Sequence, residues 1–359
     1  MPKYRFDEIA INSTEKKKPV EEDKYTYLGL EHLDTGSLTV TRFGSDVAPI
    51  GEKLIMKKGD VLVGKRRAYQ KKVAIAPFDG IFSAHGMVLR PKENVIDKDF
   101  FPLFISSDYF LDAAIKISVG SLSPTINWRD LKVLEFELPS LEEQRKLAKA
   151  LWSIIRTIEA YKELLKKNDE LVKSQFIEMF GNPETNSKHY PLVKLSSISD
   201  FWNGLTYKPS DVTQDNSGML VLRSSNIQNG QLSFEDNVRV TCPVKDKLLI
   251  RENDILMCSR NGSASLVGKT ALIKGVKEQM TFGAFMMIIR SKYFPYLKSY
   301  FDTTAFRKRI STGTSTINQI TGKMLNDIDL PVPDLESVEQ FKNFIDQTDK
   351  SKFAVHLTG

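Results

Sequence analysis

The stretch KLIMKKGDVLV, from Lys53 to Val63, recurs 194 positions later as KLLIRENDILM, from Lys247 to Met257. At the same offset Arg66 corresponds to Arg260. A repeat of this length decides the architecture, because each copy of a repeated sequence forms the same structural unit. The chain of 359 residues therefore contains two copies of one fold, and its length is sufficient for two separate cores.

The repeat extends on both sides of this stretch. Leu28 to Leu38 matches Leu222 to Leu232, with Gly36 and Gly230 marking the same turn, and a Thr-Ile-Asn loop begins at Thr125 and again at Thr316. Short apolar runs such as Val61–Gly64 and Ile255–Met257 predict strands. The segments 100–117 and 296–310 are helical in pattern. Each copy is thus expected to be α+β, with a proline-bounded exit that leads into a further helix.

The segment after Pro139 predicts one long helix. Residues 141–180 contain no glycine or proline and hold eight basic and seven acidic residues, which is typical of a solvated helix. Ser140 is the expected N-cap and Gly181 the expected stop. At 1.5 Å per residue the helix extends about 60 Å. Apolar residues at spacings of three and four form the seam of a coiled coil, and the alternative is a helix packed on its own domain; the seam residues expected at a subunit interface are Leu151, Ile154, Ile158, Tyr161, Leu165, Asn168 and Val172.

Composition excludes several classes of protein. Hydrophobic residues make up 41% and charged residues 27%, as in ordinary globular proteins, and the net charge of +6 favours an anionic partner such as nucleic acid. No apolar run is long enough to span a membrane and the N-terminal residues do not resemble a signal peptide, so we expect a cytoplasmic protein. Cys242 and Cys258 match no metal or disulfide motif, and the four histidines lack ligand spacing, so no metal site and no cofactor are expected.

Two motifs resemble the specificity subunits of type I restriction-modification systems. The block LPSLEEQRKL at 138–147, followed by LVKSQFIEMFG at 171–181, is similar to the central region of that family. The stretch CSRNGSASLVGK at 258–269 is similar to a segment of its target recognition domains. The resemblance implies target recognition domains at 1–139 and 182–334, a coiled-coil spacer at 140–181 and a shortened second helix at 335–359.

The resemblance also implies a function. Such a chain binds double-stranded DNA, reads a bipartite target, has no catalytic residues of its own, and directs modification subunits and, through them, a restriction and translocase subunit. The second helix has at most twenty-five residues against forty in the first. We therefore expect the first helix to expose part of its apolar seam, which would bind a modification subunit or a second copy of the chain.

Candidate DNA contacts follow from charge and loop placement. Residues 57–72 hold seven cations against one anion, and such a loop can neutralise phosphates or read bases, although a solvated basic surface loop is the alternative. The hydroxyl-rich loops can bind phosphates or simply cap local turns. The candidates are Lys65, Arg66, Arg67, Tyr69, Gln70, Lys71, Lys72, Ser121, Ser123 and Thr125 in the first copy, and Arg223, Arg260, Asn261, Ser263, Lys269, Thr314, Ser315 and Thr316 in the second.

Enzymatic alternatives fit the sequence poorly. A Walker A motif fails at residues 262–270, because five residues separate the glycines where four are required and a strand pattern follows. No methyltransferase motif is present, and no nucleophilic triad can be identified. The principal alternative is a non-catalytic protein-interaction or scaffold module that uses the long helix and carries incidental basic loops. Salt-dependent binding to duplex DNA separates the two classes.

Overall fold

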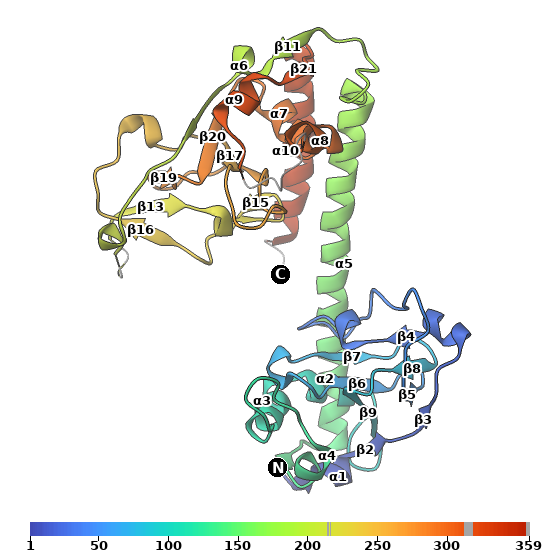
Figure 1. Ribbon diagram of the computed structural model, residues 1–359. Helices are drawn as coiled ribbons and strands as arrows, with labels where there is room; N and C mark the ends of the chain where they lie inside the picture. Colours follow the sequence, from blue (N-terminus) through green and yellow to red (C-terminus); the bar gives the residue numbers. More distant parts are fainter. Residues whose placement is uncertain (214, 216, 312–318, 357–359) are drawn as a thin grey trace. The chain divides into compact units, whose positions relative to one another are not determined.

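The computed structural model describes residues 1–213, 215, 217–311 and 319–356, with side-chain environments given up to residue 349. The chain divides into two compact units, Met1–Tyr161 and Lys162–Gly359, and each unit is α+β (Figure 1). The division falls within the long helix, so each unit holds part of it. The α+β expectation is confirmed.

In the first unit, short strands precede and follow small helices. Its strands are β1 (Lys3–Arg5), β2 (Ala10–Ser13), β3 (Lys16–Lys17), β4 (Tyr27–Leu28), β5 (Lys53–Met56), β6 (Val61–Gly64), β7 (Val73–Ile75), β8 (Gly80–Phe82), β9 (Gly86–Pro91) and β10 (Glu135–Glu137). Its helices are α1 (Phe6–Ile9), α2 (Phe101–Ser106), α3 (Asp108–Lys116), α4 (Trp128–Leu131) and the first half of α5 (Leu141–Phe180).

The second unit follows the same order. Its strands are β11 (Leu192–Lys194), β12 (Asp200–Asn203), β13 (Met219–Leu222), β14 (Ile227–Gln228), β15 (Gln231–Leu232), β16 (Val238–Val240), β17 (Ile255–Cys258), β18 (Thr270–Leu272), β19 (Met280–Phe282), β20 (Met286–Arg290) and β21 (Asp329–Pro331). Its helices are α6 (Leu195–Ile198), α7 (Phe294–Phe301), α8 (Thr304–Ile310), α9 (Gly322–Asn326) and α10 (Leu335–His356).

The central sheets show that the sequence repeat is a structural repeat. The order β2-β9-β6-β7 in the first unit corresponds to β12-β20-β17-β18 in the second, and every pairing is antiparallel. A parallel pair accompanies each sheet, β4 with β8 and β13 with β19. The turn glycines Gly36 and Gly230 both have positive φ, 76° and 75°. Both copies therefore need glycine at the same turn, as the sequence predicts.

A buried ion pair occurs in both copies. Arg90 donates from Nε and Nη2 to the two carboxylate oxygens of Asp60, at 2.7 and 2.9 Å, and Arg290 donates to Asp254 at 2.7 Å twice. Each carboxylate also accepts a backbone N–H, from Lys57 and from Arg251 respectively. The aspartates are nearly inaccessible to solvent, so this bidentate pairing satisfies groups that would otherwise be costly to bury.

The smaller sheets differ between the copies. In the first unit β5 adds to β8, giving the order β3-β5-β8-β4, whereas in the second unit β16 adds to β13, giving β16-β13-β19. Residues 246–248, which correspond to the start of β5, form a 3-10 turn. The two copies thus extend the same parallel pair in opposite directions, although the sequences of these segments are similar.

Both helical segments predicted within the copies are interrupted. Ser107 is extended and caps α3 by accepting from the backbone N–H of Phe110, and Thr303 caps α8 by accepting from that of Phe306. The extended residue ends the first helix. Its hydroxyl then starts the second helix, because it accepts from a backbone N–H that has no acceptor within that helix. The segments 100–117 and 296–310 are therefore helix pairs.

The long helix α5 begins and ends where the sequence predicts. Ser140 accepts from the backbone N–H of Glu143, and Glu143 in turn accepts from the backbone N–H of Ser140, which forms a capping box. The Ser140 hydroxyl also donates to the Glu143 carboxylate at 2.7 Å, and this bond, together with that from the Ser140 N–H, lowers the pKa of Glu143. Gly181 follows the helix with φ of 74°. Local signals alone therefore fix both ends of this 40-residue helix.

One face of α5 packs on the first unit. The buried amide of Gln144 bonds to the backbone of Val95, Asp97 and Pro139, and Ala148, Trp152 and Ile155 pack against the hydrophobic core. Residues spaced by three or four positions share a helix face, which explains this set. The alternative of a helix packed on its own domain is thus correct for this face.

The end of α5 packs within the second unit, beside α10 (Figure 1). Phe176 and Phe180 contact Phe341 of α10, with ring centroids 5.9 and 5.3 Å apart, and both also contact Tyr296 of α7. Burial raises the pKa of the Tyr296 hydroxyl, which donates to the carbonyl of Pro331. The helix α10 has 22 described residues and α5 has 40.

Candidate nucleic-acid interface

In the first unit, the loop after β6 brings together residues that are far apart in sequence. The backbone N–H of Arg66 donates to the carbonyl of His85 at 3.3 Å, and its Nε donates to Ser123 Oγ at 3.1 Å. Thr125 forms a bridge with Arg66, and its hydroxyl donates to the carbonyl of Ser123. The predicted basic loop and the predicted hydroxyl-rich loop are therefore one surface.

Two cations of the basic loop are bound within the protein. Lys71 Nζ lies 2.5 Å from Asp108 and 2.7 Å from Asp112 of α3, and Lys72 Nζ donates to the carbonyl of Leu30 at 2.6 Å. The two carboxylates raise the pKa of Lys71. The net charge of +6 between Lys57 and Lys72 therefore overstates what this loop can offer to an anion.

The remaining residues of the loop differ in exposure. Burial, and then the neighbouring charge of Lys16, lower the pKa of Lys65. Arg67, with φ of 55°, is exposed, and the Tyr69 ring is also largely exposed. Gln70 accepts from Thr35 through its backbone carbonyl, and Ser121 is exposed on the facing loop. Arg67 and Tyr69 are thus the exposed loop side chains, besides Arg66, that can meet a ligand, and Lys65 is partly buried beside them.

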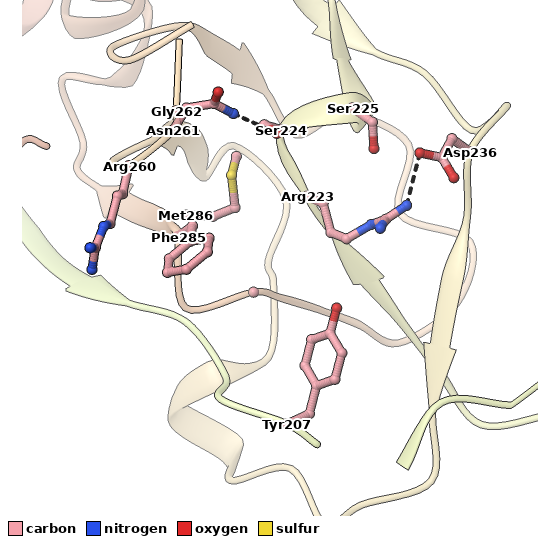
Figure 2. Close-up of a pocket in the computed structure, with 11 residues that line it drawn as sticks. Tyr207, Arg223, Ser224, Ser225, Asp236, Arg260, Asn261, Gly262, Phe285 and Met286 are labelled. Atoms are coloured by element: carbon pink, nitrogen blue, oxygen red, sulfur yellow. Dashed lines mark hydrogen bonds and ion pairs between the residues drawn. The ribbon is translucent and has the colours of Figure 1, made fainter. Parts of the chain in front are cut away.

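In the second unit, the equivalent loop borders a pocket of about 700 Å³. Figure 2 shows Arg223, Arg260 and Asn261 around it, three candidates that come from two separate segments of the sequence. The Asn261 amide donates to Ser224 Oγ at 3.2 Å, and its carbonyl oxygen accepts from the backbone N–H of Ser263. The fold therefore places part of the predicted set in one concave surface.

The sequence analysis missed several residues that line the pocket, among them Tyr207, Asp236 and Phe285. Tyr207, Asp236 and Phe285 come from loops before β13, before β16 and before β20. Asp236 forms an ion pair with Arg223, at 2.8 Å. Phe285 is 60% exposed although it lies within an apolar run, and that exposure is visible only in the structure. The backbone carbonyls of His85 and Phe285 accept from the N–H groups of Arg66 and Arg260. His85 and Phe285 therefore occupy equivalent positions in the two copies.

The other predicted residues of the second unit lie elsewhere. The Ser263 hydroxyl is bonded to that of Ser265, and Lys269 precedes β18 beside Cys258. Neither residue lines the pocket. Thr314, Ser315 and Thr316 lie outside the described residues.

The predicted interface face of α5 is divided between exposed and partly buried residues. Leu151, Ile154 and Ile158 are 39%, 55% and 47% exposed. Tyr161, Leu165, Asn168 and Val172 are partly buried, and Val172 packs on the core of the second unit. Within this predicted set the exposed residues lie in the first part of the helix, while Leu164, Leu171 and Ile177 are exposed further along it.

The described part of the chain shows no metal centre and no membrane span. Within it, no group of three or more histidine, cysteine or acidic side chains is arranged to hold a metal ion. No helix among the described residues combines the length and apolar character that crossing a bilayer requires.

The molecule thus consists of a repeated α+β unit, and each copy carries a donor-rich surface beside its central sheet. Residues 9–168 match the type I restriction modification DNA specificity domain. The chain is 23% identical over 248 residues to the type I restriction enzyme EcoKI specificity subunit of Escherichia coli K12, covering 65% of this chain and 52% of that protein. It is 28% identical over 170 residues to the StySPI specificity subunit of Salmonella potsdam, covering 44% and 36%.

The solved structures agree in fold. The S subunit of a type I restriction-modification system from M. genitalium has a TM-score of 0.58 at 15% identity, covering 99% of this chain and 93% of that chain. The match to the specificity-domain family covers residues 9–168, somewhat less than half of this chain, and the solved structure shows that the fold is shared. The alignment of this chain spans about half the length of the EcoKI relative.

Proposed function

We propose that the chain is the DNA-reading subunit of a type I restriction-modification complex. Each unit would bind one half of a bipartite duplex target, and partner subunits would carry out methylation and cleavage. The observation that carries this proposal is the recurrence of one arginine, Arg66 and Arg260, at the same fold position beside donor-rich loops of different composition. One fold with two different surfaces suits two different half-sites.

The chain itself would be non-catalytic and would act in the cytoplasm. Support comes from the family and from the chemistry of the candidate surfaces, which consists of arginine, lysine, amide and hydroxyl groups. Such groups bind phosphates and base edges. In this proposal residues 1–139 and 182–334 are the recognition domains, 140–181 is the spacer, and 335–359 is the shorter helix.

Partner subunits would bind the exposed seam of α5. Leu151, Ile154 and Ile158 leave apolar surface in contact with water, while a neighbouring face of the helix is packed on the first unit. Exposed apolar rows of this kind mark protein contacts. We propose a modification subunit as the occupant, because a DNA-reading chain without catalytic groups requires one. In this arrangement the helix also acts as a scaffold, because it holds the partner subunit.

Duplex DNA binding tests the function directly. We expect the full chain to bind duplex DNA with an affinity that falls steeply as salt is raised, because phosphate contacts release counterions. Arg66→Ala and Arg260→Ala should weaken binding. The matched controls Arg129→Ala and Lys194→Ala remove cations that pair with Asp130 and Asp329 outside the two loops, and should leave binding unchanged. Absence of salt-dependent binding would favour the scaffold alternative.

A further inference from the structure

Arg260 is held by its backbone and by an aromatic ring. Its backbone N–H donates to the carbonyl of Phe285 at 3.1 Å, and it forms a bridge with Gln319. Its guanidinium carbon lies 5.4 Å from the centroid of the Phe285 ring (Figure 2). Within the described residues, no hydrogen bond or ion pair reaches this guanidinium. An arginine stacked on a ring keeps its donor fork directed outward at little further cost in side-chain entropy.

Two residues that line the same pocket also hold buried donor atoms without a partner among the described residues. Arg223 Nε and Ser225 Oγ are buried, and neither has a hydrogen-bond partner among the described residues. Asp236 holds the Nη2 of Arg223 at 2.8 Å, which fixes the direction of this second guanidinium. Buried donors require an acceptor. The pocket is therefore suited to a ligand that presents hydrogen-bond acceptors.

The Asn261 side chain is bonded within the protein at both ends of its amide. Its amide nitrogen donates to Ser224 Oγ and its amide oxygen accepts from the backbone N–H of Ser263. Bidentate recognition of adenine needs both ends of an amide side chain. Among the described residues that line the pocket, Asp236 is the only carboxylate, and one of its oxygens is paired with Arg223.

Taken with the proposed function, on which this step depends, we infer that the second unit reads a guanine through Arg260. Guanine is the base whose major-groove edge offers two adjacent acceptors, O6 and N7, and an arginine fork matches them. Phe285 acts as a positioning residue that sets the plane of the guanidinium. A phosphate would be bound through the positive charge of Arg260, and it would not require the Phe285 ring to fix the orientation of the guanidinium.

The first unit supports this assignment by contrast. Arg66 makes the equivalent backbone bond, to His85, but its guanidinium is held by Ser123 Oγ. The two arginines therefore share a backbone position and differ in what orients the side chain. A guanine requirement set by the ring of Phe285 should belong to the second half-site alone.

The test is selection of bound duplexes from a randomised library by the full chain, followed by measurement of Kd on the selected site. We expect one guanine in the second half-site. Replacing it by 7-deazaguanine, or replacing Arg260 by alanine, should weaken binding about 5- to 100-fold. The salt slope should stay unchanged, and Arg260→Ala should no longer distinguish guanine from adenine at that position.

Phe285 provides the matched pair of variants. Phe285→Tyr keeps the ring and should keep the guanine preference, whereas Phe285→Leu keeps the apolar volume and should lose part of it. Thermal unfolding of all variants should match the parent chain, because both side chains are exposed.

Two results would overturn the guanine assignment while leaving DNA recognition intact. One is an Arg260→Ala variant that loses affinity equally for every sequence while its salt slope falls by about one, the signature of a phosphate contact. The other is a second half-site without guanine. A parent chain that binds no duplex in any salt would instead contradict the proposed function itself.

Discussion

The two units share a core and differ at the surface. The ion pairs Asp60–Arg90 and Asp254–Arg290 have the same geometry, and each joins the residue just before one central strand, β6 or β17, to the neighbouring strand, β9 or β20. The arginines Arg66 and Arg260 also have the same backbone position. What differs is the setting of each guanidinium, a serine hydroxyl in one unit and a phenylalanine ring in the other. Repetition thus preserves the scaffold and leaves the ligand-facing residues free to vary.

The number of cations in a loop does not show how many of them are available to an anion, and the two units differ in this respect. The first unit has the more basic loop, but Lys71 and Lys72 are bound to other parts of the same unit. The second unit has fewer cations, and its pocket retains donors without a protein partner among the described residues. The net charge of each loop, counted from the sequence, therefore does not show which of the two surfaces binds an anionic ligand better.

The largest expected effect tests the shared core. Asp60→Ala and Asp254→Ala should each lower the free energy of unfolding by about 3–5 kcal/mol, because each leaves a partly buried arginine without its carboxylate. Chemical denaturation monitored by hydrogen exchange in each unit measures the two effects separately. A loss below about 1 kcal/mol in either unit would show that the pair is not a common structural element.

The two faces of α5 give the next contrast. Trp152→Ala removes a ring packed on the first core and a hydrogen bond to the carbonyl of Asp99, and should cost about 2–3 kcal/mol of stability. Leu151→Ala on the exposed face should cost less than about 1 kcal/mol. The order of the effects on partner binding should be the reverse: in co-purification with a modification subunit, Leu151→Ala should reduce binding more than Trp152→Ala. Equal effects of the two variants on partner binding would contradict the docking proposal.

Releasing Lys71 should sharpen the difference between the loops. The double variant Asp108→Asn with Asp112→Asn removes both carboxylates that bind Lys71. We expect tighter binding to duplex DNA and a salt slope steeper by up to about one unit, because one more cation becomes available to phosphate. Asp130→Asn, which frees Arg129 outside the loop, is the control. An unchanged slope in the double variant would place Lys71 away from the DNA.

The smallest expected effect concerns Lys65. Its lowered pKa means that the folded state disfavours the charged form, so the penalty is fully present at pH values below the folded pKa. Stability should rise as pH increases through the folded pKa towards the ordinary lysine value. Lys65→Met should remove this pH dependence, raise stability near neutral pH by on the order of 0.5 kcal/mol, and weaken DNA binding. Parallel titrations of unfolding and of Kd distinguish the two effects.

Features set by local sequence were predictable. The ends of α5 follow from Ser140, Glu143 and Gly181, and β6 and β17 follow from short apolar runs beside an aspartate. The repeat was visible because both copies keep the same apolar pattern. In these cases the physical cause lies within a few residues of its effect.

Features set by topology were not predictable. Tyr207, Asp236 and Phe285 reach one pocket from three loops, and no local pattern marks them. Likewise, the carboxylates that bind Lys71 lie on α3, some forty residues further along the chain, where charge counting in a short window does not find them. The opposite extension of the small sheets also escaped the sequence, because 53–56 and 247–250 read alike.

Mapping of methylated DNA sites tests the central claim most directly. The full chain would be co-expressed with a type I modification subunit, as the parent and as the Arg66→Ala and Arg260→Ala variants. The account predicts a bipartite motif with an unspecified gap, in which each variant relaxes a different half. A single contiguous motif, or two variants that relax the same half, would contradict it.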